Sequence, residues 1–159
     1  MNLCQFHTGC FGCCGHTFGT KEDVCETIKK NMVEFRAAQS IDSFATRQSG
    51  LRSCGICVNI GVIEGKIGCL VHPLRNKNKD LRIGYCDNAY LCETQYSFLS
   101  WPDEKQQAFL RFITDRNPDY HEYSIRIDNG SLLLEFETQE AAVMQARLLP
   151  KEDKVDHNN

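Results

Sequence analysis

Ten cysteines dominate this sequence, and all of them lie between Cys4 and Cys92 of the 159-residue chain. In a reducing compartment, cysteine at this density indicates metal binding or thiol chemistry more often than disulfides. The opening residues MNLCQFH contain neither a basic segment nor an apolar one, so they do not read as a secretory signal. We therefore expect a cytoplasmic protein whose chemistry lies in the first three fifths of its chain.

The confinement of the cysteines predicts two parts in one α+β protein. We expect residues 1–95 to form a small cysteine-rich, metal-centred domain. Residues 96–150 are predicted to be a helix–β-hairpin–helix element packed on it, and residues 151–159 a disordered tail. The apolar fraction of 42% and the charged fraction of 25% are typical of soluble globular chains. No apolar run is long enough to span a bilayer, so we expect no membrane role.

The N-terminal part contains one clear helical pattern. Thr20 can cap a helix in TKEDVCETIKKNMVEFRAAQ, with Asp23 completing a capping box, and apolar residues follow at helical spacing. Residues 40–53 are polar and weakly periodic, so they are predicted to be a connection. The stretch CVNIGVIEGKIGCLV mixes β-branched residues with glycines, which predicts short strands or turns.

The C-terminal part is predicted to begin with a helix that Ser100 or Trp101 caps and that carries Pro102 in its first turn. In YSIRIDNGSLLLEF, a two-residue Asn-Gly turn would pair alternating apolar residues across a β-hairpin. A closing helix is predicted to start at Thr138 and to stop at Pro150.

The middle cysteines have the spacing of a zinc site. Cys54 and Cys57 form one C-x2-C knuckle, and Cys69 with His72 forms a C-x2-H knuckle eleven residues later. Two such knuckles can present four ligands tetrahedrally to zinc. The region holds more sulfur than one site can use, which suggests one or two zinc ions. The further candidate ligands are Cys4, Cys10, Cys13, Cys14, Cys86 and Cys92.

The motif CFGCCG at residues 10–15, followed by GKIGCLVHPLRNKNKDLRIGYC at residues 65–86, resembles the YkgJ-type cysteine-cluster proteins. The resemblance spans roughly residues 10–92 and leaves the C-terminal part uncovered. It implies that zinc or an iron-sulfur centre is bound by Cys10, Cys13, Cys14, Cys57, Cys69 and Cys86. The family is described mostly as metal-binding, so the resemblance implies no particular reaction.

Other functions remain open from the residues alone. An iron-sulfur cluster accepts the same thiolate ligands as zinc. The pairs Cys10/Cys13 and Cys54/Cys57 could instead cycle between dithiol and disulfide. Cys25 lies alone on the apolar side of a predicted helix and is expected to pack rather than to bind. Sulfur-saturated metal sites are mostly closed, so we expect a non-catalytic role.

Charge bears on the partners of the protein. A net charge of -3 and a pI near 5.9 disfavour nucleic acid. The stretch HPLRNKNKDLR, which runs from His72 to Arg82, is the one local concentration of positive charge. We interpret it as a site for a phosphate or acidic ligand, or as a solvated loop that offsets nearby thiolates.

Overall fold

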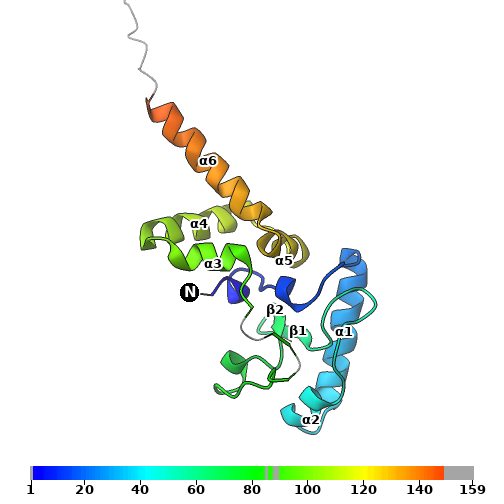
Figure 1. The fold of residues 1–159 in the computed structure, drawn as a ribbon. Helices are drawn as coiled ribbons and strands as arrows, with labels where there is room; N and C mark the ends of the chain where they lie inside the picture. Colours follow the sequence, from blue (N-terminus) through cyan, green and yellow to red (C-terminus); the bar gives the residue numbers. More distant parts are fainter. Residues whose placement is uncertain (1, 85, 88–89, 149–159) are drawn as a thin grey trace, which may run out of the picture.

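The computed structural model describes residues 2–84, 86–87 and 90–148 (Figure 1). Helices and one small two-stranded antiparallel sheet make up a mixed, mostly helical α+β fold, so the predicted fold class is confirmed at this level. The elements are η1 (Leu3–Gln5), η2 (Gly12–Cys14), α1 (Lys21–Ala37), α2 (Ile41–Thr46), β1 (Ile60–Ile63), β2 (Lys66–Cys69), η3 (Pro73–Arg75), α3 (Glu93–Ser100), α4 (Asp103–Arg116), α5 (Tyr120–Asp128) and α6 (Ser131–Leu148). In the described part of the chain, no helix combines the length and the apolar character needed to cross a bilayer.

Helix α1 confirms the prediction from the capping box. The Thr20 side chain accepts a hydrogen bond from the Asp23 amide, and the Asp23 carboxylate accepts one from the Thr20 amide. Val24 and Ile28 are buried on the face that packs toward the sheet. Asn31 is also fully buried, and its amide group donates 2.8 Å to the carbonyl of Ile60. Helix α1 therefore fixes the start of β1 through a specific polar contact.

Strands β1 and β2 form the predicted short β-structure. Ile60 pairs with Cys69 and Gly61 with Gly68 in an antiparallel hairpin. Glu64 and Gly65 form its turn with φ angles of 52° and 77°, the left-handed conformation that two-residue hairpin turns require. The hairpin places Cys69 at the end of β2, next to the first residue of β1.

Two helices were not predicted from the sequence. Residues 40–53 were expected to be a connection, but α2 begins at Ile41 with a reciprocal cap between Ser40 and Ser43. Helix α3 covers residues 93–100, and Trp101 ends it instead of starting the next helix. Helix α4 therefore begins at Asp103 after Pro102, one or two residues beyond the predicted caps.

The predicted C-terminal β-hairpin is wrong. Residues 120–128 form α5, and α6 begins at Ser131 and runs through Thr138, where a separate closing helix was expected. Asn129 and Gly130 connect the two helices. The predicted stop at Pro150 and the tail at residues 151–159 lie outside the described residues.

Physical chemistry accounts for this helix pair. Asp119 accepts hydrogen bonds from the amides of His121 and Glu122 at 2.9 and 3.0 Å, which caps α5 firmly. Tyr123 and Ile127 alternate as strand residues would, but their spacing of four also places them on one helical face. Both are fully buried, while Leu134, another apolar residue of the predicted hairpin, is 67% exposed on α6.

The main core joins the beginning of the chain to its end. Leu3 is fully buried among Phe98, Phe109 and Tyr123. Its amide donates to Gln95 Oε1 at 2.7 Å, and its carbonyl accepts from the Tyr123 hydroxyl at 2.8 Å. A second core lies between α1 and the hairpin. The division into residues 1–95 and 96–150 stays a prediction, and the first residues pack directly on the C-terminal helices.

Candidate metal centre

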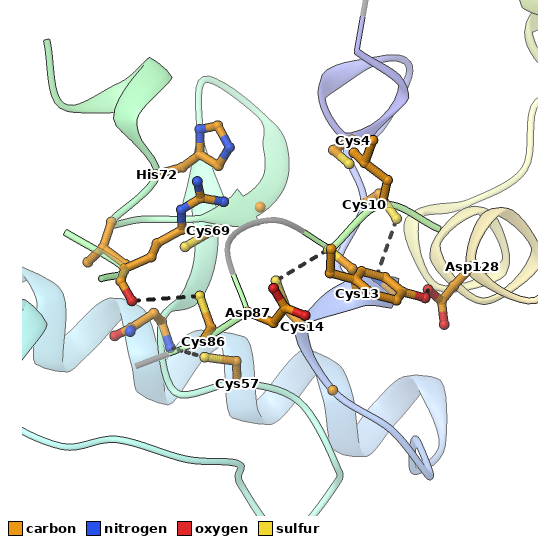
Figure 2. A pocket seen from close by; sticks show the side chains of 18 of the residues that line it. Cys4, Cys10, Cys13, Cys14, Cys57, Cys69, His72, Cys86, Asp87 and Asp128 are labelled. Carbon is orange, nitrogen blue, oxygen red and sulfur yellow. Dashed lines mark hydrogen bonds between the residues drawn. The ribbon is translucent and has the colours of Figure 1, made fainter. Parts of the chain in front are cut away.

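One cavity of about 630 Å³ collects most of the cysteines (Figure 2). Its wall includes seven thiols from four separate regions of the chain, contributed by Cys4, Cys10, Cys13, Cys14, Cys57, Cys69 and Cys86. His72, Arg75 and Arg82 also line it. Cys10 belongs to the main core, whereas Cys14, Cys57 and Cys69 pack against the second core. Val71, which also lines the cavity, belongs to a third core against which Cys69 packs as well. The cavity wall is thus shared between three cores.

The motif CFGCCG forms η2, which brings two cysteines to the cavity. The fully buried Phe11 holds its start, because its amide donates 3.1 Å to Ser124 Oγ of α5. Gly12 is required here: a Cβ atom at this position would lie 2.5 Å from the Ser124 carbonyl oxygen. The Sγ atoms of Cys13 and Cys14 are 3.8 Å apart. Close packing of η2 on α5 therefore sets where both thiols lie.

Backbone hydrogen bonds bring Cys57 and Cys69 to the side of the cavity where Cys14 lies. The Cys57 amide donates 2.7 Å to the carbonyl of Cys14. The Leu70 amide donates 2.8 Å to the carbonyl of Asn59, which joins the end of β2 to the Cys57 loop. Cys86 completes this side of the cavity, and its Sγ donates 3.9 Å to the carbonyl of Arg82. Figure 2 shows these sulfur atoms grouped together.

His72 lines the cavity but has a structural role at η3. Its Nδ1 accepts a hydrogen bond from the Leu74 amide at 3.2 Å. A neutral imidazole in this arrangement carries its proton on Nε2, which then cannot bind a metal. Burial lowers the pKa of His72, and the positive charge of Arg82 lowers it further. Both effects favour the neutral ring. The geometry favours capping over ligation for this residue.

Two predicted ligands lie away from the large cavity. Cys54 lines a smaller cavity beside α1, where its Sγ donates 3.1 Å to Thr27 Oγ1. The two members of the C-x2-C knuckle therefore face different spaces. Cys92 is buried in the main core at the start of α3. The structure brings together eight of the ten predicted site residues, and Cys54 and Cys92 are the two that it places elsewhere.

The thiols of the cavity differ in acidity. Hydrogen bonds from the neighbouring thiols of Cys14 and Cys4 lower the pKa of Cys13 to about 3. The same bonds, together with burial, raise the pKa of Cys4 and Cys14. Burial raises the pKa of both Cys10 and Cys69 to about 12. The pKa of Cys13 is thus lowered, whereas the pKa values of the other cavity thiols are raised.

The basic stretch is largely engaged by the protein itself. Arg82 forms hydrogen bonds with both carboxylate oxygens of Asp80, at 2.9 and 2.8 Å. Lys79 pairs with Asp42 of α2. Arg75 is the exception: it lies over Gly68, where a Cβ atom would be 2.8 Å from its guanidinium, and its buried Nη1 has no hydrogen-bond partner among the described residues. The ion pairs of Lys79 and Arg82 leave less free positive charge for an external phosphate than the sequence suggests.

Sequence reasoning missed Asp87 and Asp128, which line the cavity among the thiols. The incorrect hairpin concealed Asp128. On α5 it lies four residues after Ser124, so both face η2, and its Oδ1 accepts from the Tyr90 hydroxyl at 3.4 Å. Burial raises the pKa of the Asp128 carboxyl most, and the charge of Cys13 raises it further. Helical spacing from the Asp119 cap is the signal that could have identified it.

Among the described residues, no three His, Cys, Asp or Glu side chains are arranged as the ligands of one ion. Coordination would therefore require rotation of several thiols toward a shared centre. Comparisons of the chain with protein-family models, with curated proteins and with solved structures found no match in any of the three.

Proposed function

We propose that this chain is a zinc-binding protein in which the cavity cysteines hold the metal and the role of the metal is chiefly structural. The observation that carries the proposal is the convergence of seven thiols, from segments up to 82 positions apart, on one cavity. Thiolates this close repel one another, and a bound cation offsets that repulsion while holding them deprotonated.

A structural role fits the weak regular structure of the segment around the cavity. Between α2 and α3, the described chain has only two four-residue strands and the single turn of η3. Few backbone hydrogen bonds of regular secondary structure hold such a segment, so metal binding can supply part of its folding free energy. Sulfur-rich sites of this kind are mostly non-catalytic. We propose the cytoplasm as the compartment, because it keeps these thiols reduced.

Metal analysis of the full-length chain tests the proposal. Protein purified without oxygen should contain zinc in stoichiometric amount, and the solution should be colourless. The matched control is Cys25→Ser, which leaves the cavity intact and should retain the same zinc content. Protein that contains no metal and rejects added zinc would contradict the proposal.

An iron-sulfur cluster is the second candidate for the same cavity. A volume of about 630 Å³ and seven thiols exceed what a single zinc ion needs. Brown protein that contains iron and acid-labile sulfide would favour this candidate over zinc.

Thiol-disulfide exchange is the third candidate. The low pKa of Cys13 and its 3.8 Å separation from Cys14 Sγ support it. The position of Cys54 and Cys57 in different cavities counts against the second predicted redox pair. Reversible formation of a Cys13 disulfide in protein without metal would favour this candidate.

A further inference from the structure

We propose that the cavity holds two metal ions on opposite sides of the Cys13–Cys14 pair. The first would be a closed centre with four sulfur ligands from Cys14, Cys57, Cys69 and Cys86. The second would have three sulfur ligands, from Cys4, Cys10 and Cys13, and one position that an exchangeable ligand can occupy. This inference rests on the proposed binding of zinc and adds the division of ligands and a ligand-binding position.

The number of thiols exceeds one tetrahedral site. A zinc ion takes four sulfur ligands at about 2.3 Å, so three of the seven cavity thiols would stay unused. Those three thiols, which form the second centre, come from the first thirteen residues. Of the four ligands of the first centre, Cys57, Cys69 and Cys86 come from the hairpin region and the segment after it. Chain connectivity thus already separates the two groups.

Hydrogen bonds within the first group hold its members together. The bond from the Cys57 amide to the Cys14 carbonyl is 2.7 Å long, and an isolated β-bridge pairs the following Gly15 with Ile56. Gly15 and Gly55 lie where these two segments approach closely, and neither position has room for a side chain. Gly55 also adopts a φ of 86° and lies against the His16 carbonyl. The backbone of Cys14 is therefore tied to the hairpin side of the cavity.

The second group has its own backbone links. The Cys10 amide donates 3.0 Å to the carbonyl of Cys4, and the Gly12 amide donates 3.3 Å to Cys10 Sγ. Figure 2 shows Cys4, Cys10 and Cys13 together, on the side of Asp128. Cys13 and Cys14 are successive residues of η2, and their Sγ atoms are 3.8 Å apart. The two ions of this proposal would therefore be close neighbours, with one of these cysteines bound to each.

Charge in the cavity wall also differs between the two sides. A zinc ion with four thiolates has two surplus negative charges. Arg75 and Arg82 both interact electrostatically with Cys69, so these two guanidinium groups can offset that surplus. Asp128 lies with the three-sulfur group instead. The pattern suits a saturated centre beside the arginines and a less charged one near the carboxyl.

The fourth position of the second centre would face the remaining cavity. In the described part of the wall, the other thiols belong to the first group. Cys92 packs in the main core with Cys10 and is not among the residues that line the cavity. Leu51, Val71 and Leu91 also line the cavity, whose volume falls in the range of small-molecule sites. A soft or borderline donor, either a small thiol or an imidazole nitrogen, is the chemical class that such a position accepts.

Cobalt substitution of the full-length chain tests this division. Anaerobic Co²⁺ titration should show two bound equivalents, each with sulfur-to-cobalt charge-transfer absorption. Cys57→Ser and Cys4→Ser should each retain one equivalent, from the second and the first centre respectively. Cys54→Ser, a cysteine outside the cavity, is the matched control and should retain two. Cys86→Ser replaces Cys57→Ser if far-ultraviolet circular dichroism shows a loss of helix.

Added imidazole or 2-mercaptoethanol should then change the cobalt spectrum of Cys57→Ser, which keeps the open centre, and leave that of Cys4→Ser unchanged. A single equivalent in the unmodified chain would overturn the two-centre proposal but not metal binding. Loss of all cobalt from both folded variants, or equal responses to imidazole, would overturn it as well. Absence of any bound metal would instead contradict the proposed function.

Discussion

Cys13 is a residue whose environment gives it a distinct chemical character. Its sulfur receives hydrogen bonds from the thiols of Cys14 and Cys4, and these lower its pKa to about 3. Cys10 and Cys69, by contrast, have pKa values raised to about 12 by burial. Because the thiolate is the nucleophilic form, this difference sets the order in which the cavity thiols react.

Alkylation should reveal that order. In protein stripped of metal and kept reduced at pH 6, iodoacetamide should modify Cys13 before Cys10 or Cys69, as peptide mass spectrometry would show. Zinc should suppress the reaction by occupying the thiolate. Cys13→Ser is the control, and it should remove the fast phase. Simultaneous modification of all three cysteines would contradict the assigned acidities.

The raised thiol pKa values also predict how stability depends on pH. Between the ordinary thiol pKa near 9.0 and the raised values near 12, the folded chain binds more protons than the unfolded one. The stability that these two thiols contribute without metal is therefore fully present below pH 9 and falls as pH rises toward 12. Urea unfolding at pH 8 and pH 10 measures this effect. Zinc-loaded protein should lack the loss, because its thiols are already deprotonated.

At the level of elements, α1 organises the loop that leads to Cys57. Glu34 on α1 bonds to Arg52 at 2.5 Å and to Arg47 at 3.1 Å, and Arg47 donates to the carbonyl of Val58. Burial opposes ionisation of Glu34, but the hydrogen bonds and charges of the two arginines prevail and lower its pKa. These ion pairs thus hold the chain next to Cys57, which lines the cysteine cavity.

Glu34→Gln should weaken this connection. Replacing the charge leaves two largely buried guanidinium groups without a carboxylate, which should cost about 2 kcal/mol of the free energy of unfolding at pH 7. The lowered pKa means that the native pair contributes above pH 4.5 and loses that contribution as pH falls. The difference between variant and native protein in urea unfolding should accordingly shrink at acidic pH. Glu26→Gln, in an exposed pair with Lys29, is the matched control.

Gly12→Ala tests the approach of η2 to α5. An added Cβ would meet the Ser124 carbonyl oxygen at 2.5 Å, so η2 must move away and carry both adjacent cysteines with it. We expect at least a tenfold loss of zinc affinity, measured by chelator competition, with helical content retained. Unchanged affinity would show that the position of η2 does not control the metal site.

The same elements show how far the sequence could predict the fold. Helix α1 and the small sheet could be predicted because the Thr20 cap and the glycine-rich turn are local signals. The C-terminal hairpin was wrong because Tyr123 and Ile127 satisfy strand and helix spacing equally. Burial against Leu3, 120 residues away, decided the outcome. Local patterns cannot report a contact over that separation.

At the scale of the whole molecule, the cavity depends on segments that the sequence places far apart. The spacing of the cysteines predicted that the region gathers thiols, yet it also joined Cys54 to Cys57 as one knuckle. The two face different cavities, because Cys54 packs beside α1 against Thr27. Spacing identifies which residues can bind a metal, whereas tertiary packing decides which of them share a space.

Removal of metal should affect the whole molecule unequally. The helices α3 to α6 share an aromatic core, but the cavity lies where that core meets the hairpin region. A strong zinc chelator should therefore lower the thermal midpoint and increase amide hydrogen exchange mainly between residues 47 and 84. Protection in α4 should persist, which makes that helix the internal reference. Uniform loss of protection would indicate that the metal supports the entire fold.

The bond between Phe11 and Ser124 has a consequence for protein synthesis, since 113 positions separate the two residues. At bacterial or eukaryotic elongation speeds of about 5–20 residues per second, the ribosome needs roughly 6–23 s to produce the second after the first. For most of that interval the cysteines near Phe11 exist without the helix on which they dock. A nascent polypeptide of this design thus acquires its finished cavity only after α5 has been synthesised, and a chaperone or glutathione would guard its thiols until then.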